Sequence, residues 1–354
     1  MLIIVGVATA VLAAGGAWLV ALLVADRLFQ GAAVAVRTVA AYCLVYWGYA
    51  WLFEALALTG VFRLSVVIPI VVVGPVAVIW FWRGSAGETL GRIRTELREE
   101  ARELAGDLCR HRWVAVGLGL IGVHVVLRMA RTLATPSFGW DDFTYHLYRA
   151  GRWVQNAGIE LESAPDAWTY YEFFPWGGDL VWAWALVWRT GDGLIPVGAI
   201  GIWLGVLLAG YAVARQLGQD RSTALIVAAA IAVLPSQISQ MSTAYVDNAV
   251  LMLVLAASLF LLVMLDEGSN GAAALLLGIS CGSGLLVKMS FLPLVAVALA
   301  IVIWFEDRRR RFAELLAFLA GMAVVLPNLL LNWIQRGSPL YPFEFVGSLP
   351  YNKQ

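Results

Sequence analysis

Nine or ten runs of predominantly apolar residues, most of them near 20 residues long, recur along the chain. A bilayer's hydrocarbon core is about 30 Å thick and a helix rises about 1.5 Å per residue, so a run of about 20 residues crosses it. Backbone groups inside lipid must be paired within each segment, which requires helices. We predict an all-α, polytopic transmembrane helical bundle with spans at about 2–25, 38–62, 64–82, 113–134, 193–214, 222–240, 243–265, 271–288, 290–305 and 313–334.

Composition supports this class. The chain is 61% hydrophobic and 14% charged, whereas soluble domains have roughly 45–50% apolar and about 25% charged residues. The formal net charge is zero, so no global field recruits nucleic acid. Cys43, Cys109 and Cys281 lie far apart in the sequence, which predicts neither a disulfide framework nor a cysteine metal site.

Arginine distribution predicts the orientation, because short cytoplasmic loops hold an excess of Lys and Arg. Residues 83–112 carry seven arginines and 308–311 are all arginine, so both are placed inside the cell. Residues 135–180 carry seven acidic residues against two arginines and are placed outside. We therefore expect an integral protein of a bacterial-type inner or plasma membrane, with a helical extracytoplasmic first loop.

Two segments are predicted to be helices that do not span. Residues 83–112 alternate Arg and Glu at helical spacing, which indicates an amphipathic charged helix on the cytoplasmic surface, with partner docking as the alternative. Residues 176–189 form a run that is too short to cross the membrane easily. If they did cross it, the arginines at 308–311 would lie on the outer side. They are predicted to form an interfacial or re-entrant helix whose four tryptophans lie at headgroup depth.

The richest polar chemistry follows the span at 113–134. In a helix, the spacing places Asp142, His146, Arg149 and Trp153 on one stripe and Asp141, Tyr145 and Arg152 on the next. Paired carboxylates repel, so one holds its proton more tightly, and a carboxylate at the outer surface is a natural general base. A helix N-cap formed by the two aspartates is the alternative.

Several basic residues are candidates for binding an anion. His124, Arg128 and Arg131 form a stripe within a span, where charges are costly unless paired or facing an aqueous cavity. Lys288 is flanked by apolar residues, and a compact ammonium suits a phosphate oxygen. Snorkelling of the arginines and interfacial anchoring of Lys288 are the alternatives. Asp247 either completes a site or caps a helix.

Aromatic residues crowd the outer loop. They form an interfacial belt, and one or two are expected to stack on a sugar ring. They are Trp140, Trp153, Trp168, Tyr170, Tyr171, Phe173, Phe174 and Trp176.

Six short motifs resemble those of the GT-C membrane glycosyltransferases, particularly the RgtA/B/C/D-like and protein-mannosyltransferase-like members. The resemblance covers about residues 113–345. The motifs are Trp140-Asp141, Thr144-Tyr145-His146-Leu147, Trp153-Val154-Gln155-Asn156, Phe174-Pro175-Trp176, Gly284-Leu285-Leu286-Val287-Lys288, and 332–343, which ends in Pro339-Leu340-Tyr341-Pro342-Phe343.

The resemblance implies transfer of a sugar from a polyprenyl-phosphate donor to a glycolipid, glycan or protein acceptor at the outer face. Asp141 is then the general base, and Asp142 either assists it or joins it in binding a divalent cation. His146 completes the catalytic group, and Asp247 is a further candidate. The implied phosphate-binding residues are Arg128, Arg149, Lys288 and Arg336, and the implied substrate-contacting aromatics are Trp140, Tyr145, Trp153 and Tyr341.

The apolar runs and the charge pattern predict N-terminal transmembrane helices (1–82) and the cytoplasmic charged helix (83–112), and the resemblance then implies a GT-C-like catalytic module (113–354) with its outer loop at 135–192. A transporter and a non-catalytic envelope-glycan assembly protein are the competing interpretations. A transporter would need inverted repeats and charges at the membrane midplane. Here the charges gather at one surface, which favours the enzyme.

Overall fold

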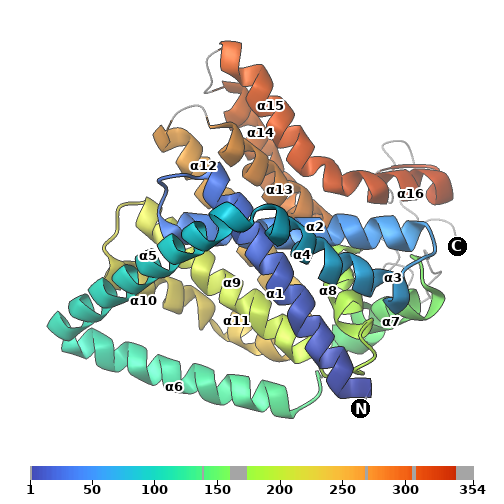
Figure 1. The fold of residues 1–354 in the computed structure, drawn as a ribbon, viewed down its shortest axis with the longest axis horizontal. Helices are drawn as coiled ribbons and strands as arrows, with labels where there is room; N and C mark the ends of the chain where they lie inside the picture. Colours follow the sequence, from blue (N-terminus) through green and yellow to red (C-terminus); the bar gives the residue numbers. More distant parts are fainter. Residues whose placement is uncertain (1, 138, 160–173, 268–269, 305–307, 340–354) are drawn as a thin grey trace, which may run out of the picture.

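The computed structural model describes residues 2–137, 139–159, 174–267, 270–304 and 308–339. Helices make up most of this described part, which contains no strand, and this confirms the predicted helical bundle (Figure 1). The helices are α1 Leu2–Leu28, α2 Val34–Leu58, α3 Leu64–Ile68, α4 Gly74–Phe81, α5 Arg83–Arg110, α6 Arg112–Ala134, α7 Leu147–Asn156, α8 Gly177–Leu186, α9 Ile195–Gln216, α10 Arg221–Ala232, α11 Pro235–Ser239, α12 Asp247–Glu267, α13 Gly271–Val287, α14 Leu292–Trp304, α15 Arg308–Met322 and α16 Leu326–Arg336.

Seven helical segments in the described residues are long and apolar enough to cross a membrane. They are α1, α2, α3 with α4, α6, α9, α12, and α15 with α16. The predicted span at 222–240 is instead broken, because α10 and the segment that starts with α11 meet at 66°. Leu234 adopts the extended backbone that a following proline favours, and Pro235 then starts a new helix. The segments at 271–288 and 290–305 form shorter apolar helices, α13 and α14.

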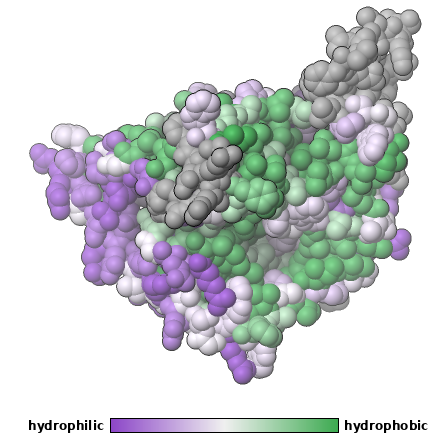
Figure 2. Space-filling view, turned by 90° about the horizontal axis from the view of Figure 1, so that it is seen from above, coloured by the Kyte–Doolittle hydropathy of each residue, from purple (hydrophilic) through white to green (hydrophobic). Residues whose placement is uncertain are grey.

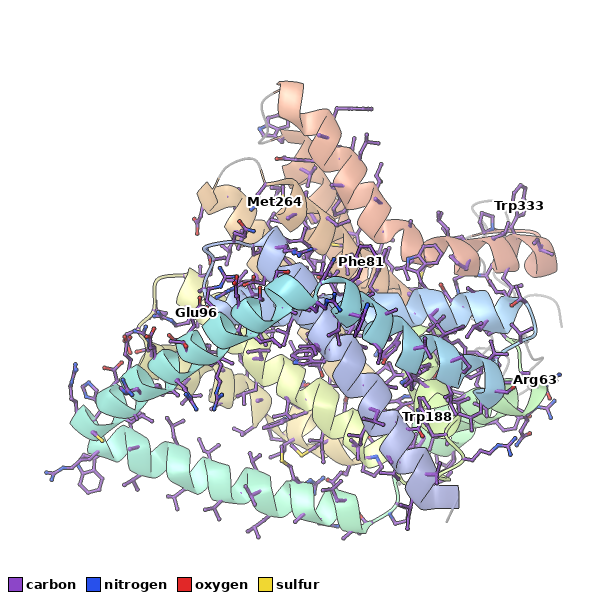
Figure 3. All side chains as sticks on the ribbon, viewed as in Figure 1. Arg63, Phe81, Glu96, Trp188, Met264 and Trp333 are labelled. Carbon is purple, nitrogen blue, oxygen red and sulfur yellow. The ribbon has the colours of Figure 1, made fainter. Side chains whose placement is uncertain are left out.

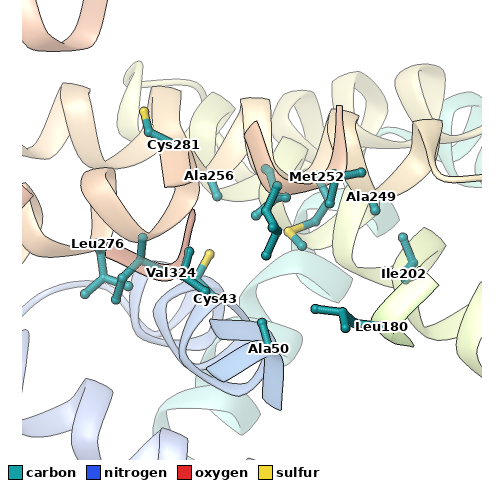
Figure 4. Packing of buried hydrophobic residues seen from close by; sticks show 14 of the residues in the cluster. Cys43, Ala50, Leu180, Ile202, Ala249, Met252, Ala256, Leu276, Cys281 and Val324 are labelled. Carbon is teal, nitrogen blue, oxygen red and sulfur yellow. The ribbon is translucent and has the colours of Figure 1, made fainter. Parts of the chain in front are cut away.

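One apolar core joins the first two helices to the later ones. Buried residues of α1, α2, α8, α9, α12 and α13 form a single cluster. Figure 4 shows Cys43 and Ala50 of α2 in the same packed layer as Met252 of α12 and Leu276 of α13. The N-terminal helices therefore pack as part of the bundle, while the predicted division of the chain at residues 82 and 112 stays a prediction.

Helices α13 and α15 approach each other closely because glycines lie at their contact. A Cβ on Gly278 would overlap the carbonyl oxygen of Phe318, and one on Gly282 would lie 2.7 Å from the Cα of Met322. On the facing helix, a Cβ on Gly321 would lie 2.5 Å from the amide nitrogen of Ile279. Small residues at such contacts let van der Waals packing drive association within lipid.

The charged segment forms α5, which is tied to the bundle by ion pairs at one end of the spans. Buried Arg37 of α2 binds Asp26 at 2.6 Å and also Glu96 of α5, which is labelled in Figure 3. Glu100 of α5 accepts hydrogen bonds from Arg221 at 2.9 Å and from Tyr211 at 2.5 Å. Figure 2 shows hydrophilic surface gathered on one side of the molecule and apolar surface over much of the rest.

Helix α8 is a buried ten-residue element packed against α2, α9 and α13. Three of the four tryptophans in and beside α8, Trp176, Trp182 and Trp188, are at most 2% exposed, while their predicted headgroup depth stays a prediction. The indole of Trp176 donates to buried Glu54 of α2 at 3.1 Å. The large rings of these three tryptophans fill the space between helices, so the tryptophans contribute to packing more than to an interfacial belt.

Replacing Gly278 with alanine should lower the free energy of unfolding by about 1–3 kcal/mol, because the added methyl group overpacks the α13 contact with α15. Gly119→Ala on α6 is the matched control, because nothing lies within 4 Å of its Cβ position. Thermal unfolding of the detergent-solubilised protein measures both changes. Equal melting temperatures for the two variants would contradict the close contact.

Candidate active site

The polar residues singled out around 128–149, 247 and 288 meet at one end of the bundle. Arg128 of α6 donates to Ser242 at 3.1 Å, and the amide of Ala244 donates to Asp142 at 2.8 Å. A Cβ on Gly139 would lie 2.6 Å from the ring of Tyr245, so glycine is required where these two segments touch. The segment after α6 is thereby held against the segment that precedes α12.

Asp142 anchors this junction. Its carboxylate is fully buried and accepts hydrogen bonds from the Ser137 hydroxyl at 2.6 Å and from Ala244. Burial raises the pKa of Asp142, although these donors and the backbone of Gly139 oppose that shift. Neither aspartate caps a helix in the way the alternative interpretation requires, because Asp141 at the N-cap position makes no capping bond. Asp142 therefore joins two chain segments.

Asp141 is only partly buried and lies beside Tyr145. Asp141 directly precedes the π-helical turn Asp142–His146, which contains Tyr145, and the Tyr145 hydroxyl donates to Asp141 at 3.5 Å. The pKa of Tyr145 is raised chiefly by burial and further by Asp141, Asp179 and Asp247 nearby, with Arg149 opposing. The phenol therefore keeps its proton and acts as a donor to Asp141.

Asp179, in the first turn of α8, is the residue that the sequence analysis missed. It is fully buried, and its two oxygens bind Nδ1 of His146 at 2.5 Å and the guanidinium of Arg149 at 2.6 Å. The signal was an acidic residue inside an apolar, tryptophan-rich run, where a charge needs a partner. Because Asp179 binds both side chains, His146 and Arg149 lie on the same stripe of the helix.

Two glycines bring α8 next to the remaining site residues. A Cβ on Gly177 would lie 2.7 Å from the backbone of Leu286, and one on Gly178 would overlap Val246. Leu286 lies two residues before Lys288, and Val246 directly precedes Asp247. The first turn of α8 therefore packs against both segments that carry the second ion pair.

Lys288 and Asp247 form that pair. The Lys288 ammonium lies 2.5 Å from Asp247 Oδ1, and Gln240 donates to Oδ2 at 3.0 Å. The side chains are 47% and 44% exposed, so both remain accessible. Lys288 itself has extended backbone and ends α13, which turns its side chain away from the helical ladder.

The other predicted residues are exposed, buried or outside the described part of the chain. Trp140 is 67% exposed. Trp153 is 1% exposed and packs edge-on against Trp176 in the core, and its contact with a substrate stays a prediction. The Arg336 side chain, Tyr341 and the aromatic residues at 168, 170, 171 and 173 lie outside the described residues.

A divalent cation has no preformed cradle in the part of the chain that the structure describes. No group of three or more His, Cys, Asp or Glu side chains is close enough there to hold a metal ion. Both oxygens of Asp142 already accept hydrogen bonds from protein donors.

Residues 183–334 match the family model of dolichyl-phosphate-mannose-protein mannosyltransferases. The match confirms the resemblance seen in the sequence and supports a membrane glycosyltransferase of this type. It includes Asp247 and Lys288, whereas Asp141, His146 and Asp179 precede it. No curated protein and no solved structure matches the chain.

Asp179→Asn should lower the free energy of unfolding by about 3–5 kcal/mol, because it removes the charge of a fully buried carboxylate that binds both His146 and Arg149. Asp247→Asn removes a half-exposed partner and should cost about 1 kcal/mol or less. Denaturant titration of both variants in the same detergent gives the comparison. A smaller loss for Asp179→Asn than for Asp247→Asn would show that Asp179 does not anchor the site.

Proposed function

We propose that the protein transfers a sugar from a polyprenyl-phosphate donor to an acceptor hydroxyl. One observation carries the proposal: Asp142, next to Asp141, accepts a hydrogen bond at 2.8 Å from the backbone of Ala244, three residues before Asp247, and Asp247 binds Lys288. A partly exposed carboxylate and an accessible cation therefore share one end of a membrane bundle. The family match over 183–334 supports mannose as the first sugar to test.

In the proposed reaction, the acceptor oxygen attacks the anomeric carbon as the bond from that carbon to the phosphate oxygen breaks. The phosphate leaves with the bonding electrons, and the hydroxyl proton passes to Asp141. The configuration at the anomeric carbon is inverted. Tyr145, as a donor to Asp141, fixes the direction of the carboxylate.

The leaving phosphate gains negative charge, which preorganised cations stabilise best. We assign this role to Lys288, because its ammonium has three protons to donate and uses one on Asp247. Arg128 is a second candidate, since it lies on the segment that meets the site and contacts Ser242. Phosphate binding by Arg336 stays a prediction from the sequence.

Arg149 and His146 are better suited to positioning than to binding phosphate. Both are held by Asp179, whose carboxylate balances the charge of Arg149. The pairing of both residues with Asp179 fixes the start of α7. It thereby positions Tyr145, which precedes His146 and whose ring packs against the imidazole. We therefore assign Asp179, His146 and Arg149 to orienting the base and its neighbour.

We place this site outside the cytoplasm on the basis of the opposite end of the bundle. There α5 exposes Arg94, Arg98 and Arg102 and pairs with residues next to the ends of α1, α2 and α9. An excess of arginine in a short loop favours the cytoplasmic side. The two ends lie on opposite sides of the spans, so the acidic end then faces outside.

Asp141→Asn should lower kcat by about 10²–10⁴-fold, because it removes the proton acceptor and keeps the shape of the side chain. Proteoliposomes supplied with radiolabelled mannosyl phosphopolyprenol and a panel of acceptors measure the transfer. Asp266→Asn is a matched control, since Asp266 is exposed at the far end of α12 and binds Gln216. Wild-type turnover by Asp141→Asn would remove that residue from the role of base.

A further inference from the structure

A large apolar cavity lies between the N-terminal helices and the helices that carry the site. Its volume is about 620 Å³, and α1, α2, α8 and α9 line it. The lining side chains are uncharged and include Trp18, Tyr46, Trp184 and Trp188. The Tyr46 hydroxyl donates to the carbonyl of Gly177 at 2.8 Å, so its polar atom is satisfied within the protein. Such a wall suits hydrocarbon and offers water almost nothing to bind.

The cavity opens sideways between α1 and α9. Val11 of α1 and Val197 of α9 both line it, yet they are 63% and 52% exposed. Both helices are candidate spans, so the opening lies along surface that faces the bilayer. A chain from a neighbouring lipid can therefore enter without crossing a polar layer.

A cation borders one end of the cavity. Trp188 and Leu194 both line the space, so the turn between them borders it. Arg189 lies on that turn, is exposed, and has φ of 58°, a left-handed conformation that is unusual for arginine. An exposed arginine on a turn next to the cavity-lining residues offers a guanidinium that is complementary to a lipid phosphate anchoring a hydrocarbon chain.

We propose that the cavity binds one acyl chain of a bilayer phospholipid and that Arg189 binds the phosphate of the same lipid. The sugar donor is a poorer occupant, because α8 separates the cavity from the candidate active site. Leu180 and Trp184 face the cavity, while the Asp179 carboxylate is occupied by His146 and Arg149. The bound chain joins α1 and α2 to α8 and so supports the helix that holds Asp179.

Two variants test the site. Gly15 lines the cavity and has nothing within 4 Å of its Cβ position, so Gly15→Phe fills the space without a backbone clash. Arg189→Gln removes the cation. Gly119→Phe repeats the glycine change on exposed α6, and Arg98→Gln repeats the arginine change on exposed α5.

Native mass spectrometry of the purified chain, with added phosphatidylglycerol or polyprenyl phosphate, measures the bound lipid. Gly15→Phe and Arg189→Gln should each reduce bound phosphatidylglycerol about fivefold or more, and the two controls should match wild type. Unchanged binding in Gly15→Phe overturns the proposal. Loss of polyprenyl phosphate with unchanged phosphatidylglycerol overturns the choice of occupant. Sugar transfer is not measured, so the result is independent of the proposed enzyme activity.

Discussion

The candidate site depends on one buried carboxylate. Asp179 has no exposed surface and would be unstable there without partners, because an unpaired buried charge costs several kcal/mol. Its two oxygens are matched by His146 and Arg149, which lie on the turn and helix that follow Asp141. This pairing fixes α7 against α8, and the glycines before Asp179 fix α8 against the segments of Asp247 and Lys288. The acidic and basic halves of the site are thus held by the same short helix.

The two ends of the bundle are organised by different polar contacts. At the end of α5, buried Arg37 and partly buried Glu100 connect the charged helix to α1, α2, α9 and α10. At the other end, the pairs of Asp179 with His146 and Arg149 are buried, whereas the pair of Asp247 with Lys288 is half-exposed and the Asp141 carboxylate is accessible. Between them, apolar packing and the glycine contact of α13 with α15 determine helix positions. Buried ion pairs therefore anchor both ends of the bundle, and only the site end combines them with an accessible carboxylate and cation, as a site at a membrane surface needs.

Much of the helix pattern followed from the sequence because crossing lipid demands a long apolar run. Prediction from the sequence fails where tertiary contacts determine the position of a side chain. A tryptophan is suited both to an interface and to a core, so the burial of Trp153 and Trp182 had no local signal. Asp247 and Lys288 lie 41 residues apart, and their contact depends on how α12 and α13 pack. Asp142 resembled a second catalytic acid, but its burial depends on Ala244, which is remote in sequence. The break before Pro235, in contrast, was readable from proline itself.

The most direct test of the site is a crosslinking measurement across the α12 and α13 ends. Asp247→Cys and Lys288→Cys would be combined in one chain and treated with a short bifunctional thiol reagent in membranes. Native Cys109 is exposed on α5, one span away along α6, and serves as the internal control. Linkage between positions 247 and 288, with none from 247 to Cys109, is the predicted result. Linkage of 247 to Cys109 in place of 288 would contradict the arrangement.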